Sequence, residues 1–338
     1  MDPIRNNGRE FPAERAVLEP VRPISNGASV KGKKIFVGLS GGVDSAVSAA
    51  LLKEDGAQVI GVFIKGWYPP GMSCTWAAER RDAMRVAARL HIPFLTLDAS
   101  VEYKKHVIDY LLAEYRAGRT PNPDVMCNRE VKFGAFYRFA KEHEADAIAT
   151  GHYRSGEKDQ SYFLWAVPKD ILNATVFPVG HMEKSKVRAL ASKFNLPVSE
   201  KRDSQGICFL GAVSVKEFLE REFGNDNPAL LYTIGQRVAG GYVIGKDVEK
   251  KEITVSKTRA GGAWEVRFTD ANWLDLPAQA GKLTEEVEAQ YRYRGERCAG
   301  LVEGDRFISS EPLPELPAPG QSIVFYRNNE LVGGGIIS

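Results

Sequence analysis

The chain has 338 residues, of which 43% are hydrophobic and 26% are charged, and its formal net charge is +2. This length suits two or three domains, and the small net charge means that any nucleic-acid binding has to come from local basic patches. No apolar run is long enough to span a bilayer, and the N-terminus lacks the apolar core of a signal peptide. We therefore expect a cytoplasmic protein that has no membrane partner.

The first half of the chain has the texture of an α/β domain. Residues 1–31 contain four prolines and no sustained apolar period, which predicts a disordered tail. Short apolar runs then alternate with helical patterns: the predicted strands are 34–38, 59–64, 94–97 and 147–150, and the predicted helices are 43–55, 76–90, 103–117, 132–142 and 183–194. This alternation predicts a parallel sheet with helices on both faces, over residues 32–211, and a ligand site beyond the carboxyl ends of its strands.

The second half of the chain changes character after residue 211. A helical stretch at 215–223 is followed by glycine-rich alternating segments, which predict a small central domain over 212–277. From 278 to 338 the chain shows short strand patterns separated by proline and glycine turns. These patterns are typical of a small antiparallel β-barrel.

The most specific motif is the run SGGVDS at 40–45, which follows the first predicted strand and opens the first predicted helix. Glycines let a backbone approach phosphate oxygens, while hydroxyls and helix N-terminal amides stabilise negative charge. The run lacks the Gly-Lys-Ser/Thr ending of the Walker loop, which serves reactions at the γ-phosphate. It favours adenylation at the α-phosphate with release of pyrophosphate, and an ordinary glycine-rich turn is the alternative.

Two polar segments each carry one cysteine. In residues 116–129, Pro121 and Pro123 predict a rigid non-helical loop that presents Asn122, Asp124 and Cys127. Nearby positive charge would stabilise a nucleophilic thiolate, and the available basic residues are Arg116, Arg119, Arg129 and Lys132. A surface turn with a buried structural cysteine is the alternative.

The second cysteine is Cys208, in the polar, glycine-containing segment 201–209. An adenylated carbonyl has a good leaving group, so a persulfide on one cysteine could displace AMP while the other resolves the adduct as a disulfide. The remaining thiols, Cys74 and Cys298, are interpreted as structural or incidental.

The loop 40–45 resembles the PP-loop pyrophosphatase superfamily, and further motifs narrow the resemblance. The segments 38–45, 118–124, 127–128, 150–153, 158–163, 206–209, 232–237 and 319–322 are together similar to the bacterial tRNA-specific 2-thiouridylase family. The resemblance runs from about residue 33 to the C-terminus. It implies an adenine nucleotide alpha hydrolase-like PP-loop domain, a small central domain and a C-terminal tRNA-binding barrel. The implied reaction is ATP-dependent 2-thiolation of the wobble uridine, position 34, of tRNA through an adenylated uridine and a cysteine persulfide.

Carried over by position, the resemblance also implies site residues. ATP, accompanied by Mg2+, would contact Gly38, Leu39, Ser40, Gly41, Gly42, Val43, Asp44, Ser45, Ile64 and Gly151. The target base would meet Asn122, Pro123 and Asp124, of which Asp124 can also move a proton; Cys127 would be the nucleophile and Cys208 the persulfide carrier. The tRNA would contact Lys158, Asp159, Gln160, Arg292 and Tyr293, and His152 and Gln321 would support activity. We expect a monomer without a protein-held metal, supplied with sulfur by a cysteine desulfurase or a relay protein.

The chain departs from the family pattern in being shorter between Tyr153 and Lys158 and before Tyr232, and Ile64 replaces a common methionine. Three other functions stay open. A PP-loop ligase or amidotransferase acting on a small metabolite would leave both cysteines idle. A non-catalytic tRNA-binding or sulfur-relay protein would not need the intact loop 40–45. An iron–sulfur enzyme would use Asp124, Cys127 and Cys208 as ligands, although cluster proteins usually supply closely spaced cysteines.

Overall fold

The computed structural model describes residues 29–69, 76–156, 158–202, 214–274 and 286–338. Most of the predicted N-terminal tail therefore lies outside the described residues, as do Cys74 and Cys208. Within the described ranges, none of the helices is both long enough and apolar enough to cross a membrane.

The N-terminal domain is built on a five-stranded sheet in the order β3-β2-β1-β4-β5. Its strands are β1 (Lys34–Gly38), β2 (Gln58–Lys65), β3 (Phe94–Asp98), β4 (Ala147–Ala149) and β5 (Thr175–Val176), and all neighbours pair in parallel. The predicted fold class is confirmed. β1 is the middle strand of this sheet, so the loop that follows β1 lies at the centre of the sheet.

Helices connect these strands. They are α1 (Val43–Glu54), α2 (Trp76–Leu90), α3 (Ser100–Tyr103), α4 (Asp109–Arg116), α5 (Pro123–Met126), α6 (Phe136–Glu142), α7 (Lys169–Asn173) and α8 (Lys184–Lys193). Two π-helical stretches, η1 (Lys104–Ile108) and η2 (Cys127–Ala135), continue α3 into α4 and α5 into α6, and a 3-10 turn, η3 (Ser161–Phe163), follows β4.

Alternation along β1 places helices on both faces of the sheet. Ile35 and Val37 are fully buried in one apolar cluster with residues of α1, α2 and α8. Phe36 points to the other face, where it is buried with Phe133 and Phe136 of η2 and α6. A strand covered on both faces reads as a continuous apolar run, which is the pattern of residues 35–37.

The helix that carries Cys127 begins earlier than the sequence predicts. The loop 116–129 was expected to present Cys127, whereas α5 starts at Pro123 and continues without a break through η2 and α6. Proline is favoured at the first helical position because its missing N–H would have no intrahelical partner there. Asn122 is the N-cap, and its side-chain oxygen accepts a hydrogen bond from the N–H of Val125 at 3.4 Å. Cys127 therefore lies on a helix, and the prediction of a loop at this position was wrong.

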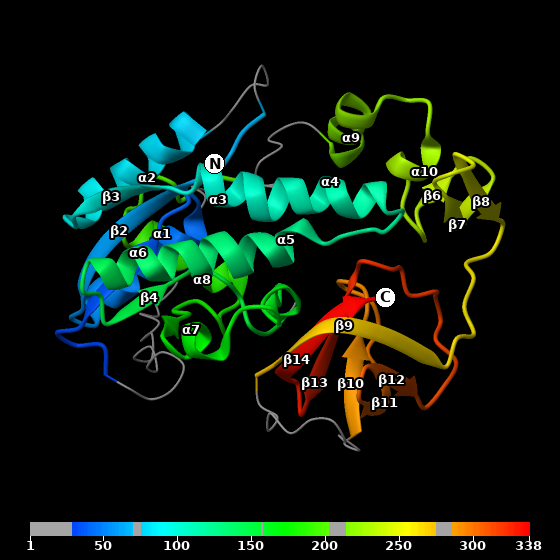
Figure 1. Cartoon of the computed structure of the whole chain (residues 1–338). Coiled ribbons are helices and arrows are strands. Elements are labelled where there is room, and N and C mark those ends of the chain that lie inside the picture. The colour runs from blue at the N-terminus through cyan, green and yellow to red at the C-terminus, as the bar shows by residue number, and fades with distance from the viewer. Residues whose placement is uncertain (1–28, 70–75, 157, 203–213, 275–285) are drawn as a thin grey trace, which may run out of the picture.

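The central part of the chain consists of two helices and a three-stranded sheet. The helices are α9 (Val215–Phe223) and α10 (Pro228–Leu231), and the strands are β6 (Arg237–Val238), β7 (Gly241–Asp247) and β8 (Glu252–Ser256). Helix α9 starts with a capping box, in which Ser214 accepts from the N–H of Glu217 and Glu217 accepts from that of Ser214. In Figure 1 helix α4 extends from the parallel sheet towards this part of the chain.

The C-terminal part is a closed antiparallel barrel in the order β10-β11-β12-β9-β14-β13. Its strands are β9 (Glu265–Trp273), β10 (Glu286–Gln290), β11 (Cys298–Glu303), β12 (Arg306–Ser309), β13 (Ser322–Arg327) and β14 (Glu330–Ile337). The expected barrel is confirmed, but β9 belongs to it although it precedes residue 278, where we placed the start of this domain. Its pairing with β12 and β14 is long-range, so no local pattern reports it.

The barrel packs tightly against the segment that follows β4. Asn272 of β9 donates to the carbonyls of Trp165 and Val167, at 2.6 and 3.0 Å. Trp165 is fully buried, and a side chain at Gly334 would come within 2.7 Å of its ring. These contacts fix the barrel relative to the parallel sheet.

Candidate active site

The turn after β1 has the geometry of an anion cradle. Gly41 has φ +75°, and a Cβ at this position would lie 2.4 Å from the carbonyl oxygen of Glu79, so only glycine fits. Gly42 is the N-cap of α1 and has no side chain with which to cap it. The first amides of a twelve-residue helix therefore face the turn without a side-chain cap, as in sites that bind phosphate.

Hydroxyls hold this turn in shape. The Ser45 hydroxyl donates to the carbonyl of Gly42 and accepts from the N–H of Ser40, both at 3.2 Å. The Ser40 hydroxyl in turn accepts from the N–H of Gly42 at 3.3 Å. The loop is therefore preorganised by its own side chains.

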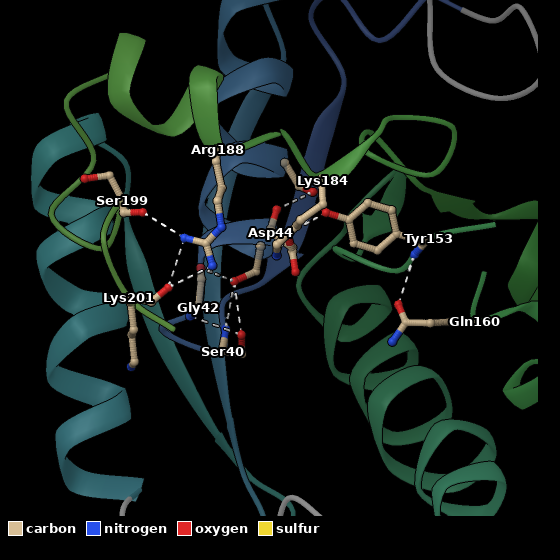
Figure 2. Close-up of polar contacts among 11 residues, drawn as sticks. Ser40, Gly42, Asp44, Tyr153, Gln160, Lys184, Arg188, Ser199 and Lys201 are labelled. Carbon is tan, nitrogen blue, oxygen red and sulfur yellow. Dashed lines mark hydrogen bonds and ion pairs between the residues drawn. The ribbon is translucent and has the colours of Figure 1, made fainter. Parts of the chain in front are cut away.

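Asp44 is held from two distant parts of the chain. Its Oδ1 accepts from the Tyr153 hydroxyl at 2.7 Å and from Lys184 Nζ at 2.5 Å, and Figure 2 shows the three side chains converging. Sequence reasoning quoted Tyr153 only as part of a motif and missed Lys184. A single lysine in the first turn of α8 carries no local signal of a contact with residue 44.

Gly151 packs directly against the loop. A Cβ on Gly151 would lie 2.8 Å from the backbone nitrogen of Ser45 and 2.9 Å from the carbonyl carbon of Asp44. Any side chain at position 151 would therefore prevent the segment after β4 from lying this close to the start of α1.

The residues just before the segment of Cys208 contact the phosphate loop. Lys201 Nζ donates to the carbonyl of Gly41 at 3.0 Å and to Asp82 Oδ2 at 2.7 Å. Arg188 of α8 donates to the carbonyls of Ser199 and Lys201, each at 3.3 Å (Figure 2). Cys208 itself lies outside the described residues, so its predicted role remains a prediction.

A pocket of about 250 Å³ opens at the carboxyl ends of β1, β2 and β4. Its lining includes these residues for which sequence analysis proposed a role: Gly38, Leu39, Ser40, Asp44, Ser45, Ile64, Cys127, Gly151, His152 and Gln160. The aromatic side chains Trp67, Tyr68 and Tyr103 also line it and were not predicted. The phosphate loop and the Cys127 thiol thus share one cavity.

The π-helical stretch η2 determines which side chains face this pocket. Cys127, Val131 and Lys132 all line it. In an α-helix a residue five positions on is rotated by about 140°, whereas the i to i+5 hydrogen bonding of a π-helix brings it back to nearly the same side as the first. The wider turn therefore places a lysine and Cys127, which is 3% exposed, on one side of the helix.

The other basic residues proposed as partners of Cys127 have other contacts. Arg119 forms a bidentate pair with Glu114, with both distances 2.6 Å. Arg129 donates to Glu130 at 2.7 Å, and Arg116 lies over the ring of Phe223. Of the four basic residues near Cys127 in the sequence, Lys132 is the one that lines the pocket.

His152 forms part of the pocket wall as a neutral ring. Its Nδ1 lies 3.0 Å from the Thr150 hydroxyl, and its ring packs on Phe133 with 5.3 Å between centroids. Burial, and then the positive charge of Lys132, lower the pKa of His152 to about 3. At neutral pH the ring can donate one hydrogen bond and accept another without adding positive charge to the pocket.

Other predicted residues lie beside the pocket. Asn122, Pro123 and Asp124 form the start of α5. Gln321, from the turn before β13, reaches this segment, because its Nε2 donates to the carbonyls of Thr120 and Pro121 at 2.8 and 3.3 Å. The barrel thereby contacts the backbone next to the predicted target-base residues.

The two segments that carry the proposed tRNA-binding residues come close together. Arg297 of the barrel lies 3.8 Å from Asp159, and Tyr293 packs on Phe163 with 4.5 Å between centroids. Gln160 Oε1 accepts from the N–H of Tyr153 at 3.1 Å (Figure 2). Lys158 lies on the same connection, two residues before Gln160.

Two acidic residues of the pocket could help to hold a magnesium ion that accompanies a nucleotide. Among the described residues, no three His, Cys, Asp or Glu side chains are grouped as metal ligands. Asp44 and Glu79 nevertheless bring two carboxylates to the lining. Mg2+ is commonly held by one or two carboxylates together with substrate phosphates.

The fold and this pocket define a nucleotide-binding α/β domain of the PP-loop type, joined to a C-terminal barrel. Family models described as "tRNA methyl transferase HUP domain" and "Aminomethyltransferase beta-barrel domain" match residues 33–212 and 264–337. The chain is 38% identical to the tRNA-specific 2-thiouridylase MnmA of Streptococcus thermophilus, over 90% of this chain and 95% of the relative. It is also 38% identical to the protein of the same name from a Marinomonas species, over 90% and 91% of the two chains. The chain belongs to the tRNA-specific 2-thiouridylase family of ATP-using PP-loop enzymes.

Solved structures are similar over about half of the chain. The U34-tRNA thiolase NcsA from Methanococcus maripaludis is 20% identical with a TM-score of 0.36, covering 57% of this chain and 68% of that one. A 4-thiouridine synthetase in complex with RNA and ATP is 22% identical with a TM-score of 0.37, covering 54% and 46%.

Proposed function

We propose that the chain is an ATP-dependent tRNA sulfurtransferase that converts the wobble uridine, position 34, to 2-thiouridine in the cytoplasm. The observation that carries this proposal is the shared pocket, in which a phosphate loop without a Walker lysine lies together with Cys127. Family membership supports the substrate and the reaction. A ligase acting on a small metabolite would give no reason for a thiol and a lysine beside the nucleotide.

The uncapped start of α1 and the backbone at Gly151 would hold the phosphates of ATP, and Asp44 would contribute to binding Mg2+. The O2 atom of the uridine attacks the α-phosphorus, the bond to pyrophosphate breaks, and an O-adenylated uridine forms. Asn122 and Asp124 would orient the base, and Asp124 can accept a proton. Neutral His152 would support the base by hydrogen bonding.

Sulfur transfer then uses both cysteines. The terminal sulfur of a persulfide on Cys208 attacks C2 of the uridine, and AMP leaves. The Cys127 thiolate attacks Cys208 Sγ, which releases 2-thiouridine and leaves a disulfide between the two cysteines. An external thiol reduces that disulfide, and a desulfurase or relay protein reloads Cys208. Lys132 would stabilise the thiolate of Cys127 and the departing phosphate. We propose that the enzyme acts as a monomer.

Labelled sulfur tests this division of roles. A desulfurase supplying the label should load Cys127→Ser protein but not Cys208→Ser protein, and neither variant should produce thiolated tRNA. Equal labelling of both variants, or multiple turnovers without a reductant, would contradict the assignment.

The nucleotide step has its own test. Asp44→Ala and Ser45→Ala should lose adenylation while the fold survives, although Asp44→Ala also removes a partner of Tyr153 and Lys184 and should lower the melting temperature. Near-wild-type thiolation by both variants would show that this loop does not activate the uridine.

A further inference from the structure

A second cavity, here called the junction pocket, lies where the three parts of the chain meet. It has a volume of about 300 Å³. Thr120 from the segment before α5, Gly235 and Gln236 from the central part, and Arg292 and Gln321 from the barrel all line it. Sequence analysis assigned tRNA contact to Arg292 and support of activity to Gln321, but it assigned no role to Thr120 or Gln236.

The junction pocket contains a buried hydroxyl that lacks a partner. Thr120 is 7% exposed, and its Oγ1 forms no hydrogen bond with any residue that the structure describes. An unsatisfied buried polar group is costly, so such groups often mark the place of a ligand or a water molecule.

Gln236 offers a second donor. Its Oε1 accepts from the N–H and the hydroxyl of Thr233, at 3.1 and 3.3 Å. This arrangement leaves its amide nitrogen as a donor for the cavity, since no partner for that nitrogen occurs within the described ranges.

Arg292 gives the junction pocket its positive charge. A Cβ on Gly235, which has φ +82°, would lie 2.1 Å from Arg292 Nη2, so the guanidinium packs on a backbone that only glycine can supply. Arg292 and Arg259 both form ion pairs with the single carboxylate of Glu315. Burial, followed by the charge of Arg259, lowers the pKa of Arg292. Two guanidinium groups sharing one carboxylate leave a net positive charge that favours an anion.

The position of the junction pocket indicates which anion fits. Thr120 is two residues before Asn122, and two residues of extended chain span about 7 Å, on the order of the spacing between successive nucleotides of an unstacked strand. Gln321 bridges the two places through its bonds to the carbonyls of Thr120 and Pro121. We propose that the junction pocket binds a backbone phosphate of the tRNA strand next to the modified nucleotide, with Thr120, Gln236 and Arg292 as donors. This inference rests on the proposed function.

Two nearly isosteric variants test the proposal with an anticodon stem-loop RNA as the probe. Gln236→Glu places a carboxylate against the phosphate and should weaken binding by about tenfold or more and lower the salt slope by about one. Thr120→Val removes one hydroxyl and should weaken binding by about threefold to tenfold. Gln58→Glu makes the same charge change at the exposed first residue of β2, at the end of the strands opposite the active site, and should have no effect. ATP affinity and melting temperature should be unchanged in all three variants.

Chemically altered RNA tests the wild-type protein directly. Stem-loops with one neutral methylphosphonate at successive linkages should lose affinity for the wild-type protein at a linkage beside the target uridine. Gln236→Glu protein should bind that RNA at least as tightly as the unmodified one, because the neutral linkage removes the repulsion. If the variants bind RNA as Gln58→Glu protein does, the proposal is wrong. It is also wrong if they lose only the binding of inorganic phosphate or pyrophosphate. A wild-type protein that neither binds tRNA nor thiolates it would instead refute the proposed function.

Discussion

Replacing Gly151 by alanine tests whether close contact between the segment after β4 and the phosphate loop is needed for nucleotide binding. The new methyl group would lie 2.8 Å from the nitrogen of Ser45 and 2.9 Å from the carbonyl carbon of Asp44, and both neighbours are backbone. The φ of Gly151 is not positive, so alanine itself is not strained there. The loop must therefore move by a few tenths of an ångström. Overpacking of this kind costs about 1–3 kcal/mol.

Part of that cost should appear in ATP affinity, because the displaced amides are those proposed to hold the phosphates. A change of about 1.4 kcal/mol corresponds to a tenfold weaker Kd, so we expect a weakening of about tenfold, measured by calorimetric titration. The melting temperature should fall by about 2–6 °C. Gly245→Ala is the matched control, since a Cβ there makes only ordinary contacts of 3.5 and 3.6 Å with Thr254. ATP binding by Gly151→Ala protein that equals both wild type and this control would refute the reasoning.

Two further predictions concern charge in the active site. Lys132→Gln should slow alkylation of Cys127 at neutral pH by about threefold to tenfold because a cation no longer stabilises the thiolate, whereas Arg129→Gln should leave the rate unchanged; equal rates in the two variants would exclude Lys132. The pKa of His152 is about 3 in the folded protein, below its ordinary value of 6.5, so the unfolded chain binds the extra proton in that range. The contribution of His152 to stability should be constant above pH 6.5 and fall towards pH 3, by at most about 1.4 kcal/mol per pH unit, and urea denaturation of His152→Gln protein should lack this component.

The sequence predicts the parallel sheet and its central loop well, because β1 is a continuous apolar run and the glycines and hydroxyl residues that follow it are typical of a phosphate-binding loop. It predicts Cys127 in the site but places it on a loop, because a proline usually interrupts a helix. In the structure Pro123 instead begins the helix that carries Cys127. Local patterns describe neighbours along the chain, and a proline is compatible with either outcome.

The features that the sequence did not predict depend on contacts between residues far apart in the chain. Tyr153 and Lys184 hold Asp44 from 109 and 140 positions away. The strand β9 is assigned to the barrel only by its pairing with β12 and β14. The junction pocket requires three segments that are adjacent only after folding. Each of these features depends on tertiary packing, which the composition of a short stretch of sequence does not reveal.

The stretch η2 can be regarded as an α-helix that has taken up one additional residue. If the same residues formed an ordinary α-helix, every side chain after the wide turn would rotate by about 100° relative to Cys127. Phe133 and Phe136, both fully buried, would then leave the core of the sheet. The wide turn of η2 therefore places these two rings in the core and also places Lys132 in the lining of the pocket. A variant in which this stretch adopted ordinary α-helical hydrogen bonding without losing a residue should therefore show a folding defect before any effect on catalysis could be measured.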